Sequence, residues 1–181
     1  MTIISRYWKS KQNDKKYFLA YEKLNLDNPT DSINGIYLFT SDINNVDTDN
    51  IGKEPFTIKI PHTLHPVSRL ELDVHKNTIG IVWASQLKEG GFRISLSKSF
   101  DETAFVTCSD HIDDFEAVEI SELNVTALEN TIITSYTAKK TYNGQLIDIG
   151  YQTSHHPRPV PNPPINVPTS IPNSNLKLFN Y

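Results

Sequence analysis

The stretch NVDTDNIGKE (45–54) is the part of the chain whose side chains are best spaced to hold a metal ion. Asn45, Asp47 and Asp49 alternate, as ligands do when successive oxygens wrap around one Ca²⁺ ion. The bidentate glutamate that such loops carry further on is absent, because position 56 is Phe. We therefore expect an ordinary polar loop and no cofactor, with Ca²⁺ at Asn45, Asp47 and Asp49 as the alternative.

The histidines and the single cysteine do not indicate a metal centre. His62 and His65 lie three apart in a proline-bounded loop, and His155 is followed directly by His156, with no carboxylate cluster beside either pair. Such groups are more typical of structural or solvent-exposed histidines than of ligands. Cys108 is the only cysteine, so the chain has no internal disulfide and no multi-cysteine metal site.

Composition restricts the class of protein. Of the 181 residues 38% are hydrophobic and 21% charged, which is typical of a globular chain. The 17 Lys+Arg and 21 Asp+Glu give a net charge of −4 without a basic stripe, so we expect no nucleic-acid partner. The N-terminus lacks the apolar core of a signal peptide, and no apolar run is long enough to span a bilayer. We therefore expect no membrane insertion, and the compartment stays open.

Three stretches of the chain can be laid on one another as a repeat. Each pairs one apolar strand with a second strand that follows a glycine-containing turn, where a positive φ favours a tight reversal. The pairs are YFLAYE (17–22) with IYLFTS (36–41), IGIVWA (79–84) with ISLSKS (94–99), and IITSYT (132–137) with IGYQTS (149–154). The first strand of each pair has an aromatic residue at its fifth position: Tyr21, Trp83 and Tyr136.

The strand patterns predict how each unit is built. LELDV (70–74) lies 53 positions before LNVTA (123–127) and alternates apolar with polar residues, as a strand with one buried face does. IGIVWA is apolar on both faces, so it should be a central strand covered on both sides. FTIKI (56–60) and FEAVEI (115–120) are candidates for fourth strands. We therefore predict an all-β fold of about three repeated four-stranded antiparallel units that resemble β-propeller blades.

Three blades do not close a ring, because propellers generally use four to eight. Three explanations stay open. Copies of the chain form one ring as a homo-oligomer, the chain is part of a longer protein, or the units stack as an open sheet or sandwich.

The composition changes after Ser154. Seven of the eleven prolines follow that residue, so we predict a β-repeat domain over 1–154 and an extended Pro-rich C-terminal tail over 155–181. The tail serves as a stiff spacer or as a ligand for an aromatic groove. Its end, LKLFNY (176–181), alternates and is a candidate terminal strand.

The hairpin SLSKSFDETAF (95–105) resembles the Asp-box (BNR) repeat of sialidase-type propellers, which reads Ser-x-Asp-x-Gly-x-Thr-Trp. Ser97 and Thr103 match the motif, whereas Ser99, Asp101 and Ala104 replace its Asp, Gly and Trp. The resemblance covers residues 15–154 as architecture. It implies an arginine triad and a tyrosine nucleophile in the enzymes, but no such triad can be named among the four arginines of this chain.

The first function that we expect is a non-catalytic binding module, with carbohydrate as the ligand that the resemblance implies. The candidate ligand-binding residues are Trp8, Tyr37, Phe39 and Arg93. Trp83 is a weaker candidate because its strand should be buried. The alternatives are a structural or interaction protein that uses the Pro-rich tail, and a fragment of a sialidase-like glycoside hydrolase. For the latter, the spacing of the acidic residues nominates no catalytic pair.

Overall fold

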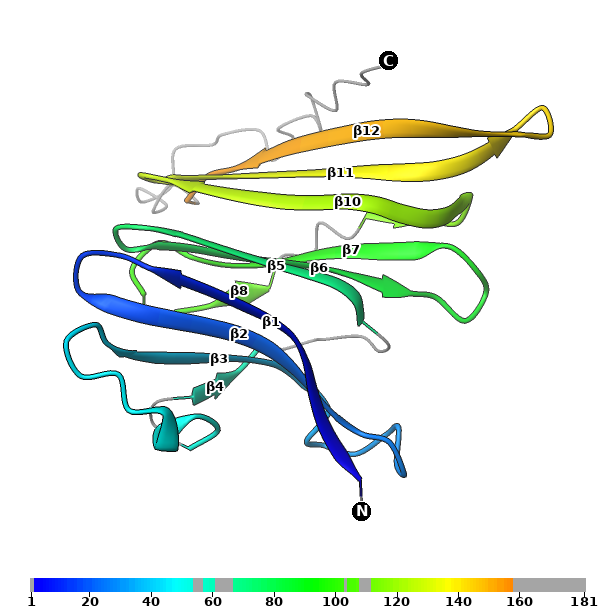
Figure 1. Ribbon diagram of the computed structural model, residues 1–181. Coiled ribbons are helices and arrows are strands. Elements are labelled where there is room, and N and C mark those ends of the chain that lie inside the picture. The colour runs from blue at the N-terminus through cyan, green and yellow to red at the C-terminus, as the bar shows by residue number, and fades with distance from the viewer. Residues whose placement is uncertain (1, 54–56, 61–66, 103, 108–111, 158–181) are drawn as a thin grey trace, which may run out of the picture.

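The fold is a stack of three antiparallel β-sheets (Figure 1). The computed structural model describes residues 2–53, 57–60, 67–102, 104–107 and 112–157, and the Pro-rich tail beyond residue 157 lies outside this part, as do His62, His65, Thr103 and Cys108. The described residues contain one short 3₁₀ turn, η1 (Thr48–Asn50), and no helix long and apolar enough to cross a membrane. The predicted all-β architecture of repeated antiparallel units is confirmed.

Each sheet is built mainly from strands that follow one another along the chain. The first sheet contains β1 (Ile3–Gln12), β2 (Lys16–Asn25), β3 (Gly35–Asp42) and β4 (Thr57–Lys59) in that order. The middle sheet contains β5 (Val67–His75), β6 (Thr78–Gln86) and β7 (Phe92–Ser99), and both β8 (Val106–Thr107) and β9 (Ile112–Asp114) pair with β7. The third sheet contains β10 (Ala117–Leu128), β11 (Thr131–Tyr142) and β12 (Gln145–His155).

The middle sheet is covered on both faces, as the pattern of IGIVWA predicts. Ile81 and Trp83 of β6 pack toward the first sheet in one core cluster that includes Phe18. The alternate residues, Val82 and Ala84, belong to a second cluster shared with the third sheet. Because successive residues of a strand point to opposite faces, β6 supplies side chains to both cores.

The aromatic residues at the repeated position lie on the corresponding face of each sheet. Trp83 points toward the sheet that precedes its own, and Tyr136 of the third sheet likewise packs in the core facing the middle sheet. Tyr21 holds the equivalent position in the first sheet and lies in a third cluster, on the face turned away from the middle sheet. All three aromatic residues at this position are buried.

The outward faces of the two outer sheets differ in polarity. On the third sheet the outward positions of β11 are largely polar and include Ser135, Thr137 and Lys139. On the first sheet the outward face is aromatic, and Ile51 from the segment that follows β3 packs against it. Stacking copies head to tail would press a polar face against an aromatic one. Association into a ring, as a homo-oligomer, stays a prediction.

Three details differ from the sequence-based expectation. FEAVEI does not close the second unit, because Ala117 begins β10 and so opens the third sheet, in which three strands are described. Gly35 does not adopt a positive φ, unlike Gly91 and Gly144 at the other two turns. A Cβ there would meet the flexible end of the Lys59 side chain, which can move aside, so neither φ nor space requires glycine at this turn.

Polar contacts join neighbouring sheets in a repeated manner. Arg6 of β1 pairs with the fully buried Glu22 and donates to the carbonyl oxygen of Val67 at 3.2 Å, while the Val67 amide donates to Glu22 at 3.2 Å. Arg69 of β5 repeats this contact by donating to the carbonyl oxygen of Ile120 in the third sheet. In each case an arginine from the first strand of one sheet bonds the first strand of the next.

Asp73 connects all three sheets. It lies in β5, its carboxylate is 3.2 Å from the Lys11 ammonium of the first sheet, and it accepts a hydrogen bond of 2.8 Å from the Ala127 amide of the third.

Removing Arg6 should destabilise the fold strongly. In Arg6→Ala the buried Glu22 carboxylate loses its counter-charge, so the free energy of unfolding in a urea titration should fall by about 3–5 kcal/mol. Lys9→Ala is the matched control, because Lys9 lies on the same strand and pairs with Glu71 of β5, but both side chains of this pair are partly exposed, so we expect a change of about 1 kcal/mol or less. Equal losses in both variants would contradict the importance of the buried Glu22 charge.

The middle and third sheets approach closely over Gly80. A Cβ at this position would lie 2.8 Å from Val125 Cγ2 and 3.1 Å from Ile132 Cγ2. Gly80→Ala should therefore lower the free energy of unfolding by about 1–3 kcal/mol. Gly150→Ala in β12 is the control, since its Cβ would meet no atom within 4 Å. A neutral Gly80→Ala would mean that the sheets can separate at no cost.

Candidate functional site

A row of stacked aromatic rings crosses the outward face of the first sheet. Trp8 of β1 stacks on Tyr21 of β2 with ring centroids 4.7 Å apart and planes 13° from parallel. Tyr21 stacks in turn on Tyr37 of β3, at 5.7 Å and 18°. Tyr21 and Tyr37 are direct partners in the β2–β3 register, so the row follows the cross-strand direction of the sheet.

A β-bulge in the edge strand sets the direction of Trp8. The β1–β2 register shifts between Arg6 and Lys9, and Tyr7 has a φ of 56°, in the left-handed region that bulky residues rarely occupy. The Tyr7 ring packs against the core between the first and middle sheets, with the Arg6 guanidinium 4.8 Å from its centroid. The bulge thus sends Tyr7 inward and brings Trp8 into the aromatic row.

Polar side chains flank Trp8 along the same strand. Ser10 pairs with Leu19 and Gln12 with Tyr17, both on the outward face, and Ser5 pairs with Lys23. All three β1 residues are exposed, and Trp8 itself is 48% exposed. The Trp8 indole nitrogen donates to the Ser5 carbonyl oxygen at 3.3 Å. We call the surface formed by Trp8, Ser5, Ser10 and Gln12 the Trp8 platform.

The two tyrosines behind Trp8 are held in place and remain neutral. The Tyr37 hydroxyl donates to the Ile33 carbonyl oxygen at 2.7 Å, and the Lys23 ammonium lies 5.8 Å from the Tyr37 ring centroid. Burial raises the pKa of Tyr21, and Tyr37 raises it further. Burial likewise raises the pKa of Tyr37, with an added contribution from the Asp31 carboxylate. The row therefore presents uncharged rings at neutral pH.

The sequence-predicted ligand residues are only partly brought together. Trp8 and Tyr37 belong to one row, whereas Phe39 is completely buried under the outward face beside Leu19, so the expectation that its ring is available to a ligand is wrong. Arg93 lies on β7 of the middle sheet and is therefore not part of the aromatic row of the first sheet. Trp83 is fully buried, as expected.

In the predicted polar loop around Asp47, the carboxylate oxygens of Asp47 accept hydrogen bonds from other residues of the loop. Asp47 caps the 3₁₀ turn, accepting from the Asp49 amide at 3.0 Å and from the Asn50 side chain at 2.8 Å. Within the described ranges no group of three His, Cys, Asp or Glu side chains is arranged to hold a metal ion. Calcium binding at Asn45, Asp47 and Asp49 stays the alternative to the ordinary polar loop that we expect.

The turn that resembles an Asp box is held by Asp101. Its carboxylate accepts hydrogen bonds of 3.0 Å from the Ser99 hydroxyl and from the Ala104 amide. Glu102 follows with a φ of 64° and pairs with Lys16 of the first sheet. The turn thus joins two sheets, and no ligand is needed to explain its residues.

The sequence did not single out Ser5, Ser10, Gln12 or Tyr21 as binding residues. In β1, two adjacent large aromatic residues, Tyr7 and Trp8, interrupt a run of polar residues. This pair does not by itself indicate the bulge, because adjacent residues of a regular strand also point to opposite faces.

Comparisons with known proteins identify no family for this chain. No protein-family model matches the sequence, and no curated protein matches it. Among solved structures it is similar to a thermostable family-43 glycoside hydrolase, with 14% identity and a TM-score of 0.44, covering 84% of this chain and 48% of that one. It is also similar to a family-32 β-fructofuranosidase from Bombyx mori, with 14% identity and a TM-score of 0.46, covering 80% and 33%.

The chain thus spans about half of one of these enzymes and a third of the other. Neither is a sialidase, and the resemblance to sialidase-type repeats is not confirmed. The similarity is too low to assign an activity.

The buried tyrosines predict a loss of stability at alkaline pH. In the unfolded chain a tyrosine ionises near pH ~10, whereas Tyr21 and Tyr37 hold their protons to higher pH when folded. The free energy of unfolding should therefore fall as the pH rises above about 10. Tyr21→Phe removes one such group and its repulsion with Tyr37, so urea titrations across this range should give a shallower decline. An unchanged slope would contradict the burial of the row.

Proposed function

We propose that the protein is a non-catalytic binding module that binds carbohydrate on the Trp8 platform. The observation that carries this proposal is a half-exposed indole, fixed by stacking on Tyr21 and by a bulge, among exposed hydroxyl and amide side chains. A sugar ring has an apolar face of C–H groups and a rim of hydroxyls. An aromatic surface surrounded by donors and acceptors complements both.

Preorganisation supports this use of Trp8. The ring is already stacked on Tyr21 in the free protein, so binding need not order a mobile side chain, which typically costs about 0.5–1.5 kcal/mol. One such platform is small, and we expect affinity in the millimolar range, roughly −4 kcal/mol. Several platforms in an assembly or a longer protein would raise the apparent affinity through multivalency.

Buried carboxylates in the described part of the chain have structural partners. Glu22 pairs with Arg6, and Asp114 lies 2.9 Å from the Lys140 ammonium. These contacts favour binding without catalysis over a fragment of a glycoside hydrolase. A role for the Pro-rich tail in binding a partner concerns residues outside the described part and stays an alternative.

Trp8→Ala should weaken sugar binding while leaving the fold intact. We expect the dissociation constant for the best ligand on a glycan array, measured afterwards by calorimetry, to rise at least tenfold, which corresponds to about 1.4 kcal/mol. Tyr142→Ala is the matched control, because Tyr142 is a large aromatic residue that is 65% exposed at the far end of the third sheet.

Two outcomes would contradict the proposal. One is that no glycan binds the wild-type protein at millimolar concentration. The other is that Trp8→Ala and Tyr142→Ala weaken binding equally, which would place the site away from the aromatic row.

A further inference from the structure

One edge of β12 is uncovered in the part of the chain that the structure describes. β12 pairs with β11, and among the described residues no strand lies on its other side. The strands at the same place in the other two sheets each have a further partner, because β4 pairs with β3, and both β8 and β9 pair with β7. As described, the third sheet therefore lacks the strand that completes the first and middle sheets.

The repeat indicates where a fourth strand would pair with β12. The register partners of the repeated aromatic position are equivalent in the three sheets: Tyr37, Ser95 and Tyr151. β4 pairs with residues 37–39 of β3, and β9 pairs with residues 92–94 of β7. Aligned through the equivalent partners, the two stretches together correspond to residues 148–153 of β12.

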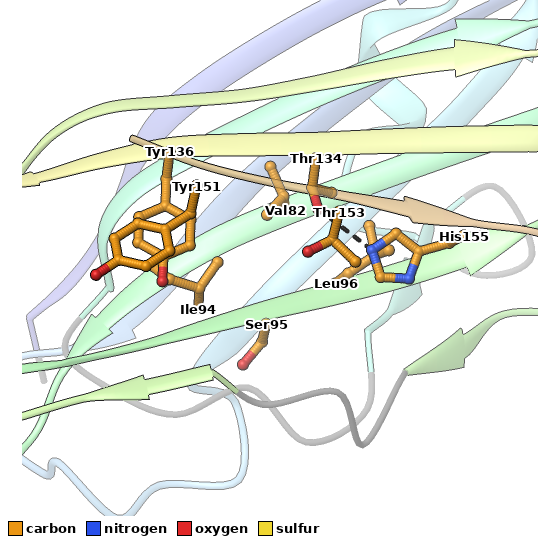
Figure 2. A pocket seen from close by; sticks show the side chains of 9 residues that line it. All are labelled: Val82, Ile94, Ser95, Leu96, Thr134, Tyr136, Tyr151, Thr153 and His155. Carbon is orange, nitrogen blue, oxygen red and sulfur yellow. Dashed lines mark hydrogen bonds between the residues drawn. The ribbon is translucent and has the colours of Figure 1, made fainter. Parts of the chain in front are cut away.

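The face of β12 that is turned toward the middle sheet is only partly covered. Ile147 is 39% exposed, and Ile149, Tyr151 and Thr153 on the same face are half-buried. Figure 2 shows Tyr151 and Thr153 beside a cavity of about 30 Å³, whose aliphatic lining comes from the middle sheet: Val82, Ile94 and Leu96. Packing between the two sheets is thus incomplete beneath β12, and a further strand would cover more of this apolar surface.

The sequence of β12 does not protect its edge from pairing. The strand is 11 residues long, contains no proline, and carries one carboxylate, that of Asp148. Folded proteins usually shorten, charge or cover such an edge, because its row of unpaired amide and carbonyl groups can pair with another chain. An edge of this length is therefore expected to have an occupant.

The Pro-rich tail contains one stretch suited to that place. Its seven prolines lie between positions 157 and 172, and proline cannot donate a backbone hydrogen bond to a sheet. Residues 173–181 contain no proline, and within them LKLFNY (176–181) begins with an alternation of apolar and polar residues. Leu176 and Leu178 would share one face of a strand, with Lys177 on the other.

The connecting segment has an adequate length. Between β3 and β4 the chain has 14 residues (43–56), and between β7 and β9 it has 12 (100–111). Between β12 and LKLFNY it has 20 (156–175). In a polyproline conformation these would span about 60 Å, whereas β12 is about 36 Å long. The segment can therefore reach any part of β12.

We infer that the free edge of β12 is a docking site for residues 176–181 of the same chain, which pair with residues 148–153 as the fourth strand of the third sheet. Main-chain hydrogen bonds along the edge hold the added strand. Leu176 and Leu178 extend the apolar layer between the middle and third sheets past Ile149. This docking site is independent of the Trp8 platform, which lies on the first sheet.

Hydrogen exchange of the full chain, followed by NMR, tests the docking site. In an uncovered edge strand alternate amides point to solvent and exchange quickly, whereas a strand paired on both sides protects consecutive amides. We expect protection at every amide of residues 148–153 in the wild type. In Leu178→Pro the amides on the free edge should exchange at least about tenfold faster. Alternating fast exchange in the wild type would overturn the proposal.

Ser170→Pro is the matched control, because it also adds a proline to the tail but lies outside the docking segment. It should leave exchange in β12 unchanged, and the amides of β6 should stay protected in every variant, which shows that the core is intact. Equal acceleration in Leu178→Pro and Ser170→Pro would overturn the proposal.

Light scattering on the same samples shows which molecule covers the edge. A monomer with all six amides protected supports docking within one chain. Protection that appears only as dimers form assigns the edge to a second copy and overturns the proposal. Protection that persists in Leu178→Pro also overturns it, because the occupant is then not the 176–181 segment.

Discussion

The two-sided burial of β6 is the constraint on which the rest of the structure depends. A strand whose residues are apolar on both faces must be covered twice, and each large side chain so buried contributes about 1.5–3 kcal/mol. Trp83 and Val82 are adjacent in sequence but belong to different cores. One strand therefore requires a sheet above and a sheet below it, and the three-sheet stack follows from that requirement.

Each outer sheet packs only one face against the middle sheet, and the outward faces of the two outer sheets differ. β11 keeps the face equivalent to that of Trp83, with Tyr136, and turns Ser135 and Thr137 to the outside. β2 keeps the apolar residues of that face although no preceding sheet covers it, and Ile51 contacts it instead. The exposed aromatic surface at Trp8 lies at the uncovered margin of this face. The candidate binding site is thus a consequence of where the repeat ends.

Features that follow from the alternation of apolar and polar residues were predicted from the sequence, whereas features that depend on contacts between distant segments were not. The burial of β6 and Trp83, the strand character of β10 and the core positions of Tyr21 and Tyr136 all follow from apolar periodicity and the internal repeat. The burial of Phe39 could not be predicted, because it depends on Ile51, which packs against the same cluster from a segment distant in the sequence.

The candidate site was predictable to a similar extent. Trp8 and Tyr37 were identified by residue type, but their alignment through Tyr21 depends on cross-strand register and on the bulge at Tyr7. Sequence patterns place strands to within a few residues, whereas a shift of one residue exchanges the two faces of a strand. Arg93 was selected for its chemistry alone, although the repeat already placed it beside ISLSKS in the second unit and Tyr37 in the first.

The Trp8 platform coincides with a departure from a local rule. At Tyr7 a bulky residue occupies a left-handed backbone conformation, which costs of order 1–2 kcal/mol. The same bulge packs the Tyr7 ring into the core between the first and middle sheets and stacks Trp8 on Tyr21 at the surface. One strained residue therefore serves both packing and the proposed site, and places where local rules fail are those expected to serve binding.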